Sequence, residues 1–200
     1  MNYYLFRHGE SEANKARCFA NYKITPSLTE TGKKQAESMH LVMKDLAIER
    51  VYVSPYKRAR ETAAIIFQDR ELYIEDNLKE IYVGELDGKS EIDPANWKKY
   101  INVVDAWEKG DNSARFEGGE SNEEVKARIE KVLARANKEC KESAAFVAHS
   151  DIFRSFFWLF CENHGKMIQD NYMDKCRVTV VSRETGSSIY RIEAFNATNL

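Results

Sequence analysis

An arginine and a histidine stand side by side at the end of the first apolar run of this chain. The run Tyr-Tyr-Leu-Phe occupies residues 3–6, and Arg7, His8 and Gly9 follow it directly. In open parallel sheets, ligands collect just beyond the carboxyl ends of buried strands, which is where Arg7 and His8 would stand. Gly9 allows a tight turn or a close backbone approach, and residues 10–14 can open a helix whose free amides favour an anion. The sequence therefore predicts a phosphate site here.

Polar residues suited to phosphate also follow two later apolar runs. They are Ser54 and Arg58 after residues 50–53, and His149 and Ser150 after residues 144–148. If the three strands are neighbours, their carboxyl ends share one edge of the sheet and the side chains converge. Arginine suits this task because its planar fork can bond two phosphate oxygens at once. Ser54 could equally cap the helix that follows it, and the sequence favours neither interpretation.

Strand and helix patterns alternate along the whole chain, and this order predicts the elements that must position those residues. Thr29 can cap one helix, Pro55 suits the first turn of a second, and Ser121 begins the capping box of a third. Two β-rich runs at residues 178–182 and 188–194 are expected to pair antiparallel. The sum is an α/β chain folded as a three-layer α/β/α sandwich with a mostly parallel central sheet.

The length and apolar content predict one domain over residues 1–200, because 200 residues with 43% apolar content can bury one sizeable core. Within it, residues 81–117 carry glycines, a proline and scattered aromatics, which indicates an irregular insertion or lid of modest size. The four cysteines show no CxxC spacing, so we expect reduced packing residues and no metal site.

Charge and hydropathy exclude several classes of partner. A net charge of -2 gives no basic field for holding a nucleic-acid backbone, so nucleic acid is not expected as a partner. No apolar stretch approaches the length of a membrane span, and the chain starts on a strand without a leader segment. We therefore expect a soluble, cytoplasmic protein with no membrane contact.

Ordered motifs span most of the chain. They are Arg7-His8-Gly9-Glu10-Ser11 with Asn14, the segments 28–32 and 54–63, Glu80-Ile81 followed by Gly84 and Gly88, Gly118-Gly119-Glu120-Ser121, and Ala148-His149. In these motifs the chain resembles the histidine phosphatase superfamily, the phosphoglycerate-mutase-like proteins. The resemblance implies the three-layer fold of that family with a modest lid insertion, and transfer of a phosphoryl group through a histidine.

The resemblance also implies a role for each site residue. His8 matches the nucleophile that takes the phosphoryl group, and Glu80 matches the proton donor to the leaving alcohol. The groups that the resemblance implies to neutralise or hold the phosphate are Arg7, Arg58, His149 and Asn14. Ser150 is expected to bind the substrate because of its position after the strand at residues 144–148. No metal or cofactor is expected, because two arginines and an imidazolium supply the positive charge that magnesium supplies elsewhere. His8 must be neutral to attack, which requires a hydrogen bond that fixes its other ring nitrogen.

The chain departs from the family pattern at two places near the substrate. The family usually has glycine after the second histidine, whereas this chain has Ser150-Asp151, and a carboxylate there repels a phosphate dianion unless it points away. Where many members have a Gln-Gly pair, this chain has Phe19-Ala20-Asn21. We therefore expect an unusual substrate side of the site.

The modest lid favours a phosphatase over a mutase. Mutases of this family are typically longer and carry paired arginines in a larger insertion. Residues 90–116 here offer Lys98, Lys99, Lys109 and Arg115 without an arginine pair. We expect a phosphatase that hydrolyses a small phosphomonoester, with phosphoglycerate mutase as the alternative. A non-catalytic phosphate-binding or scaffold protein is an alternative of another class. The partner is then a small phosphorylated substrate, and both its identity and the oligomeric state stay open.

Overall fold

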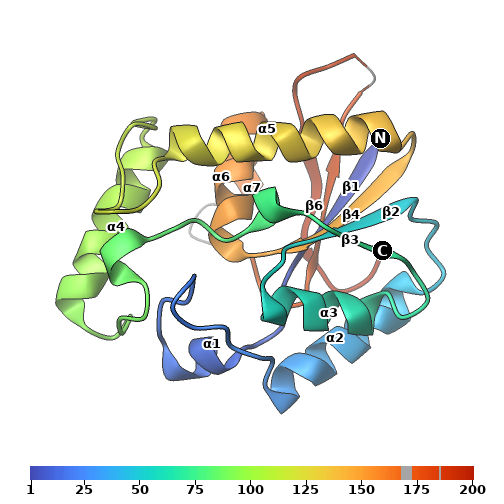
Figure 1. Cartoon of the computed structure of the whole chain (residues 1–200). Coiled ribbons are helices and arrows are strands. Elements are labelled where there is room, and N and C mark those ends of the chain that lie inside the picture. The colour runs from blue at the N-terminus through green and yellow to red at the C-terminus, as the bar shows by residue number, and fades with distance from the viewer. Residues whose placement is uncertain (168–172, 185) are drawn as a thin grey trace.

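A six-stranded sheet runs through the part of the chain that the structure describes (Figure 1). This structure is a computed structural model, and it describes residues 1–167, 173–184 and 186–200. In sheet order the strands are β3 (Leu72–Ile74), β2 (Arg50–Val53), β4 (Ser143–Ala148), β1 (Asn2–Arg7), β5 (Val178–Ser182) and β6 (Arg191–Ala197). The first four are parallel, β5 runs antiparallel to β1, and β6 runs antiparallel to β5. The predicted mostly parallel sheet with a final antiparallel pair is confirmed.

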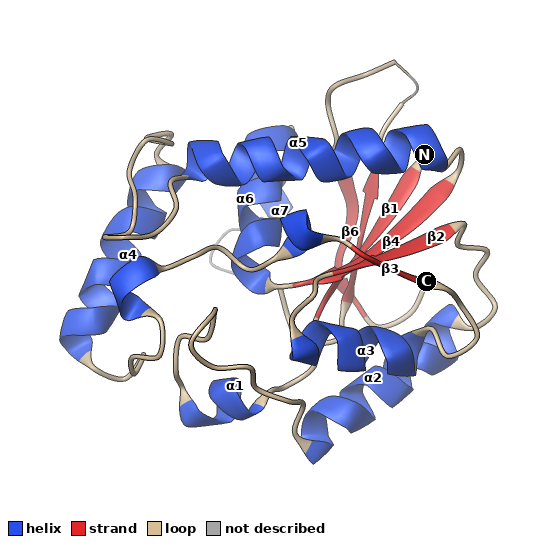
Figure 2. Cartoon of the chain, viewed as in Figure 1, coloured by secondary structure: helices blue, strands red, loops and turns tan. Residues whose placement is uncertain are grey.

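Helices cover both faces of the sheet (Figure 2). They are α5 (Asn122–Glu139) and α6 (Ser150–Phe160) on one side, and α2 (Glu30–Met43) and α3 (Lys57–Ile66) on the other. Successive residues of a strand point to opposite faces, so Tyr3 and Leu5 pack with α5 and α6 while Tyr4 and Phe6 pack with α2 and α3. This is why residues 3–6 are all apolar, and it confirms the predicted three-layer sandwich.

Two of the three predicted helix starts, at Thr29 and Ser121, agree with the structure, and the third, at Pro55, does not. The Thr29 hydroxyl accepts from the Gly32 N–H at 3.1 Å, and Ser121 closes a capping box at the start of α5. The prediction that Pro55 lies in the first turn of a helix is wrong, because α3 begins two residues later. The N–H of Ser54 still bonds to the sheet, which keeps the chain extended through this segment.

The expected irregular insertion contains a regular helix, α4 (Pro94–Glu108), so the prediction of irregular structure is wrong for these residues. The Asp93 carboxylate caps α4 by accepting from the Ala95 N–H at 2.8 Å, a signal that the sequence carries in Asp93-Pro94. The buried residues of α4 are Tyr100, Val104 and Trp107. In Figure 1, α4 lies beyond the end of the sheet that also faces α1 (Glu12–Ala16).

Four short elements complete the described chain. They are α1, the 3₁₀ turns η1 (Asp76–Leu78) and η2 (Gly84–Leu86), and α7 (His164–Met167). Within the described residues, no helix combines the length and the apolar character needed to cross a bilayer.

Candidate active site

The carboxyl ends of β1, β2 and β4 meet at one edge of the sheet. In the β1–β4 pair, Arg7 lies opposite Ala148. The next residues continue the ladder, since the N–H of His8 donates to the carbonyl of Ala148 and the N–H of Ser54 to that of Val147, both at 3.0 Å. The polar residues that follow the three strands therefore start from neighbouring positions, as the sequence predicted.

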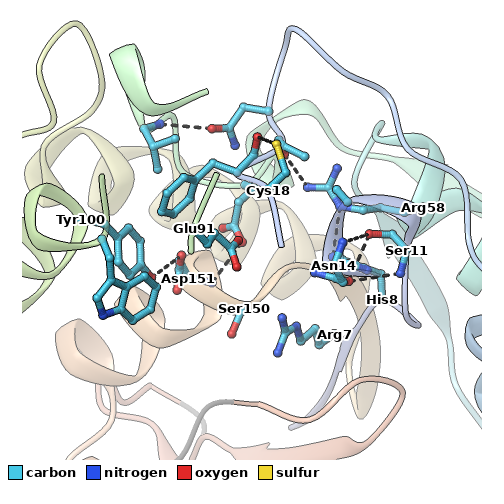
Figure 3. A pocket seen from close by; sticks show the side chains of 17 residues that line it. Arg7, His8, Ser11, Asn14, Cys18, Arg58, Glu91, Tyr100, Ser150 and Asp151 are labelled. Atoms are coloured by element: carbon cyan, nitrogen blue, oxygen red, sulfur yellow. Dashed lines mark hydrogen bonds between the residues drawn. The ribbon is translucent and has the colours of Figure 1, made fainter. Parts of the chain in front are cut away.

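A pocket opens at this edge (Figure 3). Its polar lining residues are Arg7, His8, Ser11, Asn14, Asn21, Arg58, Glu80, Glu91, Ser150 and Asp151, and its aromatic lining residues are Phe19, Trp97 and Tyr100. Of the residues that the sequence predicted for the site, all line this pocket except Ser54 and His149. The His149 side chain is fully buried, and its ring centroid lies 5.1 Å from that of His8.

The His8 ring is oriented by the backbone and kept neutral by its surroundings. Its Nδ1 atom lies 2.7 Å from the carbonyl oxygen of Gly9, which can only accept, so Nδ1 carries the proton. The Nε2 atom accepts from Nε of Arg58 at 3.0 Å, so Nε2 carries no proton and its one in-plane lone pair faces that N–H group. Burial, followed by the charges of Arg58 and Arg7, holds the pKa of His8 well below its usual range. The bond that a nucleophilic histidine requires is therefore present.

Gly9 allows a close backbone approach, but the group that approaches it is the backbone of Gly32 and not a ligand. A Cβ atom at Gly9 would lie 2.6 Å from the carbonyl oxygen of Gly32, and one at Gly32 would lie 2.1 Å from that of Glu10. The Thr62 hydroxyl accepts from the Gly9 N–H at 3.0 Å and donates to the carbonyl of Arg58 at 2.7 Å. Thr62, which sequence reasoning did not single out, thus joins the His8 loop to the helix that carries Arg58.

The two arginines keep donors available toward the pocket. Arg58 donates from Nε to His8 and from one terminal nitrogen to the Ala20 carbonyl at 3.0 Å. Burial lowers the pKa of Arg58 to about 10, so it stays charged at neutral pH. Arg7 donates from one terminal nitrogen to the Met173 carbonyl at 2.7 Å, and its Nε is buried without a partner. These N–H groups can bind an oxyanion.

His149 is bound to Ser54 rather than to a charged group. Its Nε2 lies 2.8 Å from the Ser54 hydroxyl, whereas its Nδ1 is buried without a partner. Burial and the charge of Arg58 hold the pKa of His149 well below its usual range. If the Ser54 hydroxyl donates to Nε2, the neutral ring carries its proton on Nδ1 and can donate it to a ligand. The protonated, imidazolium form of His149 that the sequence analysis expected is thus unfavourable before an anion binds. Ser54 acts as the hydrogen-bond partner of His149.

The Glu80 carboxylate lies over the first turn of α6. Its two oxygens accept from the N–H groups of Ile81 at 3.0 Å, Asp151 at 3.2 Å and Ile152 at 2.9 Å. These bonds favour the charged carboxylate. Burial and the nearby Asp151 carboxylate outweigh them and raise the pKa of Glu80 to about 7. A carboxyl group with such a pKa can both give and take a proton near neutral pH.

The carboxylate of Asp151, the first departure from the family pattern, is tied to its neighbours. It accepts from the Tyr100 hydroxyl at 2.8 Å and lies 3.9 Å from a terminal nitrogen of Arg154. Ser150 is 8% exposed, and its hydroxyl is buried without a partner. Figure 3 shows Ser150 between Arg7 and Asp151 in the pocket wall.

Asn14 is oriented by Ser11 in the capping box of α1. Its side-chain oxygen accepts from both the N–H and the hydroxyl of Ser11 at 3.1 Å. The Asn14 amide NH₂ is then the group left to donate to a ligand of the pocket that this residue lines.

A loop at the second departure, residues 19–23, supports Arg58 through its backbone. The Asp87 carboxylate accepts from the N–H groups of Asn21 at 2.8 Å, Tyr22 at 2.9 Å and Lys23 at 3.0 Å. The Asn21 side chain donates to the Ile81 carbonyl at 2.9 Å. Sequence reasoning missed Asp87, whose only signal is its position before Gly88 in a family motif. It also missed Glu91, which lines the pocket.

Metal ligation has no support in the side chains that the structure describes. Among residues 1–167, 173–184 and 186–200, no three or more His, Cys, Asp or Glu side chains form a group that could hold a metal ion. The positive charge in the described pocket lining comes from Arg7 and Arg58.

Comparisons with known proteins agree with the fold. The alpha-ribazole phosphatase from Shigella flexneri superposes with a TM-score of 0.78 at 19% identity, covering 100% of this chain and 98% of that one. The adenosylcobalamin/alpha-ribazole phosphatase of Salmonella typhimurium is 38% identical over 87 residues, which are 42% of this chain and 43% of that protein. The 2,3-bisphosphoglycerate-dependent phosphoglycerate mutase of Thermoplasma acidophilum is 36% identical over 87 residues, 42% of this chain and 44% of that protein.

The two relatives found by sequence are thus matched over less than half of their length, and they have different activities. A family model covers much more of the chain, because it matches residues 3–198. With a match of that extent, the chain belongs to the histidine phosphatase superfamily (branch 1).

Proposed function

We propose that this protein is a metal-independent phosphatase that hydrolyses a small phosphomonoester through a phosphohistidine on His8. The observation that carries the proposal is the His8 ring, whose Nδ1 donates to the Gly9 carbonyl while the unprotonated Nε2 accepts from Arg58. A neutral, oriented imidazole next to a buried cation can attack a phosphorus atom whose oxygens that cation binds.

In the first step the Nε2 lone pair of His8 leaves the Arg58 N–H and forms a bond to phosphorus, and the bond from phosphorus to the ester oxygen breaks. Glu80, with a pKa of about 7, gives its proton to the departing oxygen, so the product leaves as a neutral alcohol. Arg7 and Arg58 bind the phosphoryl oxygens, and Nδ1 of His149 donates a further hydrogen bond.

The second step regenerates the enzyme. A water molecule gives a proton to the Glu80 carboxylate and attacks phosphorus, and the bond from phosphorus to Nε2 breaks. The electron pair of that bond returns to His8, whose low pKa favours the neutral ring. Inorganic phosphate then leaves the two arginines.

The distribution of charge supports a phosphatase over a phosphoglycerate mutase. A mutase must also hold the carboxylate of phosphoglycerate, which requires further cations in the pocket. The described lining residues beyond the two arginines offer Glu91 and Asp151 instead. We further propose that residues 1–200 act as one domain in which residues 81–117 form the lid, since Trp97 and Tyr100 of α4 line the pocket.

Release of inorganic phosphate tests the proposal. Purified protein with EDTA present is assayed on a panel of phosphomonoesters that includes p-nitrophenyl phosphate and 3-phosphoglycerate, and formation of 2-phosphoglycerate is followed in parallel. We expect phosphate release without isomerisation, and its loss in His8→Ala but not in the control His164→Ala. Isomerisation faster than release would make the protein a mutase, and turnover retained in His8→Ala would refute the proposed nucleophile.

A further inference from the structure

The half of the pocket away from the arginines is acidic and aromatic (Figure 3). The carboxylates of Glu91 and Asp151 line it together with three aromatic rings. Trp97 and Tyr100 are stacked with their centroids 5.2 Å apart, and the Phe19 ring lies 5.3 Å from that of Tyr100. This half of the pocket, which we call the acidic aromatic subsite, is defined by Phe19, Glu91, Trp97, Tyr100 and Asp151.

The charge of Glu91 has no close partner. In the part of the chain that the structure describes, no ion pair within 4.0 Å and no side-chain hydrogen bond involves the Glu91 carboxylate. Arg17, Arg7 and Lys175 act on it only over longer distances, and burial together with Asp151 raises the pKa of Glu91. A carboxylate in this state gains from a cationic ligand. The buried Ser150 hydroxyl beside it also lacks a partner.

The acidic aromatic subsite is on the side where the leaving alcohol must lie. Glu80 has to reach the ester oxygen in order to protonate it, and the Glu80 carboxylate is held by the N–H groups of Asp151 and Ile152. An alcohol that departs beside Glu80 therefore extends along Asp151 toward Glu91, while the phosphate stays with Arg7 and Arg58. This step rests on the proposed function.

We propose that the acidic aromatic subsite selects leaving alcohols that carry a protonated or quaternary amine, so that the substrate class is phosphorylated amino alcohols. Tyr100 is stacked between Trp97 and Phe116, so the exposed ring is that of Trp97. A cation over the Trp97 face that Tyr100 does not cover is attracted by the ring and by the two carboxylates at once. An alcohol that carries a carboxylate would meet like charges at the same place. The two halves of the pocket thus match a zwitterion, with the phosphate at the arginines and the amine at the carboxylates.

A matched pair of substrates separates charge from shape. Phosphocholine and 3,3-dimethylbutyl phosphate have the same outline, but the second has a neutral carbon where the first has a quaternary nitrogen. We expect kcat/KM for phosphocholine to exceed that for the neutral ester at least tenfold, which corresponds to about 1.4 kcal/mol. In Glu91→Gln this ratio should fall at least threefold. The control Glu123→Gln removes an exposed carboxylate on α5 and should leave the ratio unchanged.

The outcomes distinguish the two proposals. Hydrolysis of p-nitrophenyl phosphate with a phosphocholine preference of less than twofold, or with a ratio that Glu91→Gln leaves unchanged, overturns the amine subsite while the phosphatase stands. Faster turnover of 3-phosphoglycerate than of both esters also overturns it. If p-nitrophenyl phosphate is not hydrolysed, the proposed function fails and calorimetric binding decides the inference. Tighter binding of phosphocholine than of 3,3-dimethylbutyl phosphate then supports the subsite, and equal binding refutes it.

Discussion

Replacing Asp151 with Asn should shift the pH range in which Glu80 works as an acid. Burial is the largest cause of the raised pKa of Glu80, and the Asp151 carboxylate is the next. Asn removes the charge of Asp151 but keeps an oxygen that can accept from the Tyr100 hydroxyl, which limits structural change. Without the negative neighbour, the charged form of Glu80 becomes more favourable, so its pKa must fall.

The size of the shift follows from Coulomb's law. If the two carboxylate charges are taken to be about 6 Å apart, they interact by roughly 2.8 kcal/mol at an effective dielectric constant of about 20. Since one pKa unit corresponds to about 1.4 kcal/mol, this is an upper value of about two units. The Tyr100 hydroxyl and the Arg154 guanidinium, 3.9 Å away, take up part of the Asp151 charge. We therefore expect the pKa of Glu80 to fall by about one unit in the variant.

A ratio of rates isolates Glu80 from the other titrating groups. An alkyl phosphate needs a proton on its leaving oxygen, whereas p-nitrophenyl phosphate hardly does. The ratio of their kcat/KM values between pH 5 and 9 cancels the ionisation of His8, and each value is first divided by the dianion fraction of its own ester because the two phosphates ionise at different pH. Because Glu80 acts as an acid only when protonated, the wild-type ratio should be high at low pH and fall with a midpoint near pH 7.

In Asp151→Asn the midpoint of this ratio should lie about one pH unit lower. The matched control Asp45→Asn, an exposed residue after α2, should keep the wild-type midpoint. A midpoint that stays in place or rises in Asp151→Asn would refute the reasoning that the Asp151 charge acts on Glu80. A wild-type ratio that does not vary with pH would remove Glu80 as the acid.

Three further predictions concern single side chains. Glu80→Gln should slow the alkyl phosphate about 10²- to 10⁴-fold and p-nitrophenyl phosphate far less, and equal slowing in steady-state assays would contradict its role. Arg58→Lys should lower kcat/KM about 10²-fold, because lysine cannot donate to both His8 and the Ala20 carbonyl. A kcat/KM within threefold of wild type would show that the planar guanidinium is not needed. Ser121→Ala removes the capping box of α5 and should lower the free energy of unfolding by about 1 kcal/mol in urea titrations, with unchanged kcat/KM; an unchanged midpoint would refute the cap.

The sequence by itself determined the layers of the fold and several polar residues of the pocket. Residues 3–6 are apolar on both faces of a strand, which is a local pattern, and it identified a buried strand with Arg7 and His8 at its end. The apolar runs at residues 50–53 and 144–148 likewise predicted two further strands, followed by Arg58 and His149. Neighbouring parallel strands bring their carboxyl ends to one edge, so these residues had to converge once the sheet formed.

Only the tertiary structure decided the hydrogen-bond partners, the pKa values and the pocket positions of these side chains. Ser54 had two local interpretations, and it became a partner of His149 because the parallel pairing of β2 with β4 brings the ends of these strands together. The raised pKa of Glu80 depends on burial and on Asp151, which lies 71 positions later in the chain. Glu91 gave no signal in the sequence, since its position against the pocket depends on how residues 81–117 fold. Burial and charge proximity arise between distant segments, and the local sequence does not contain them.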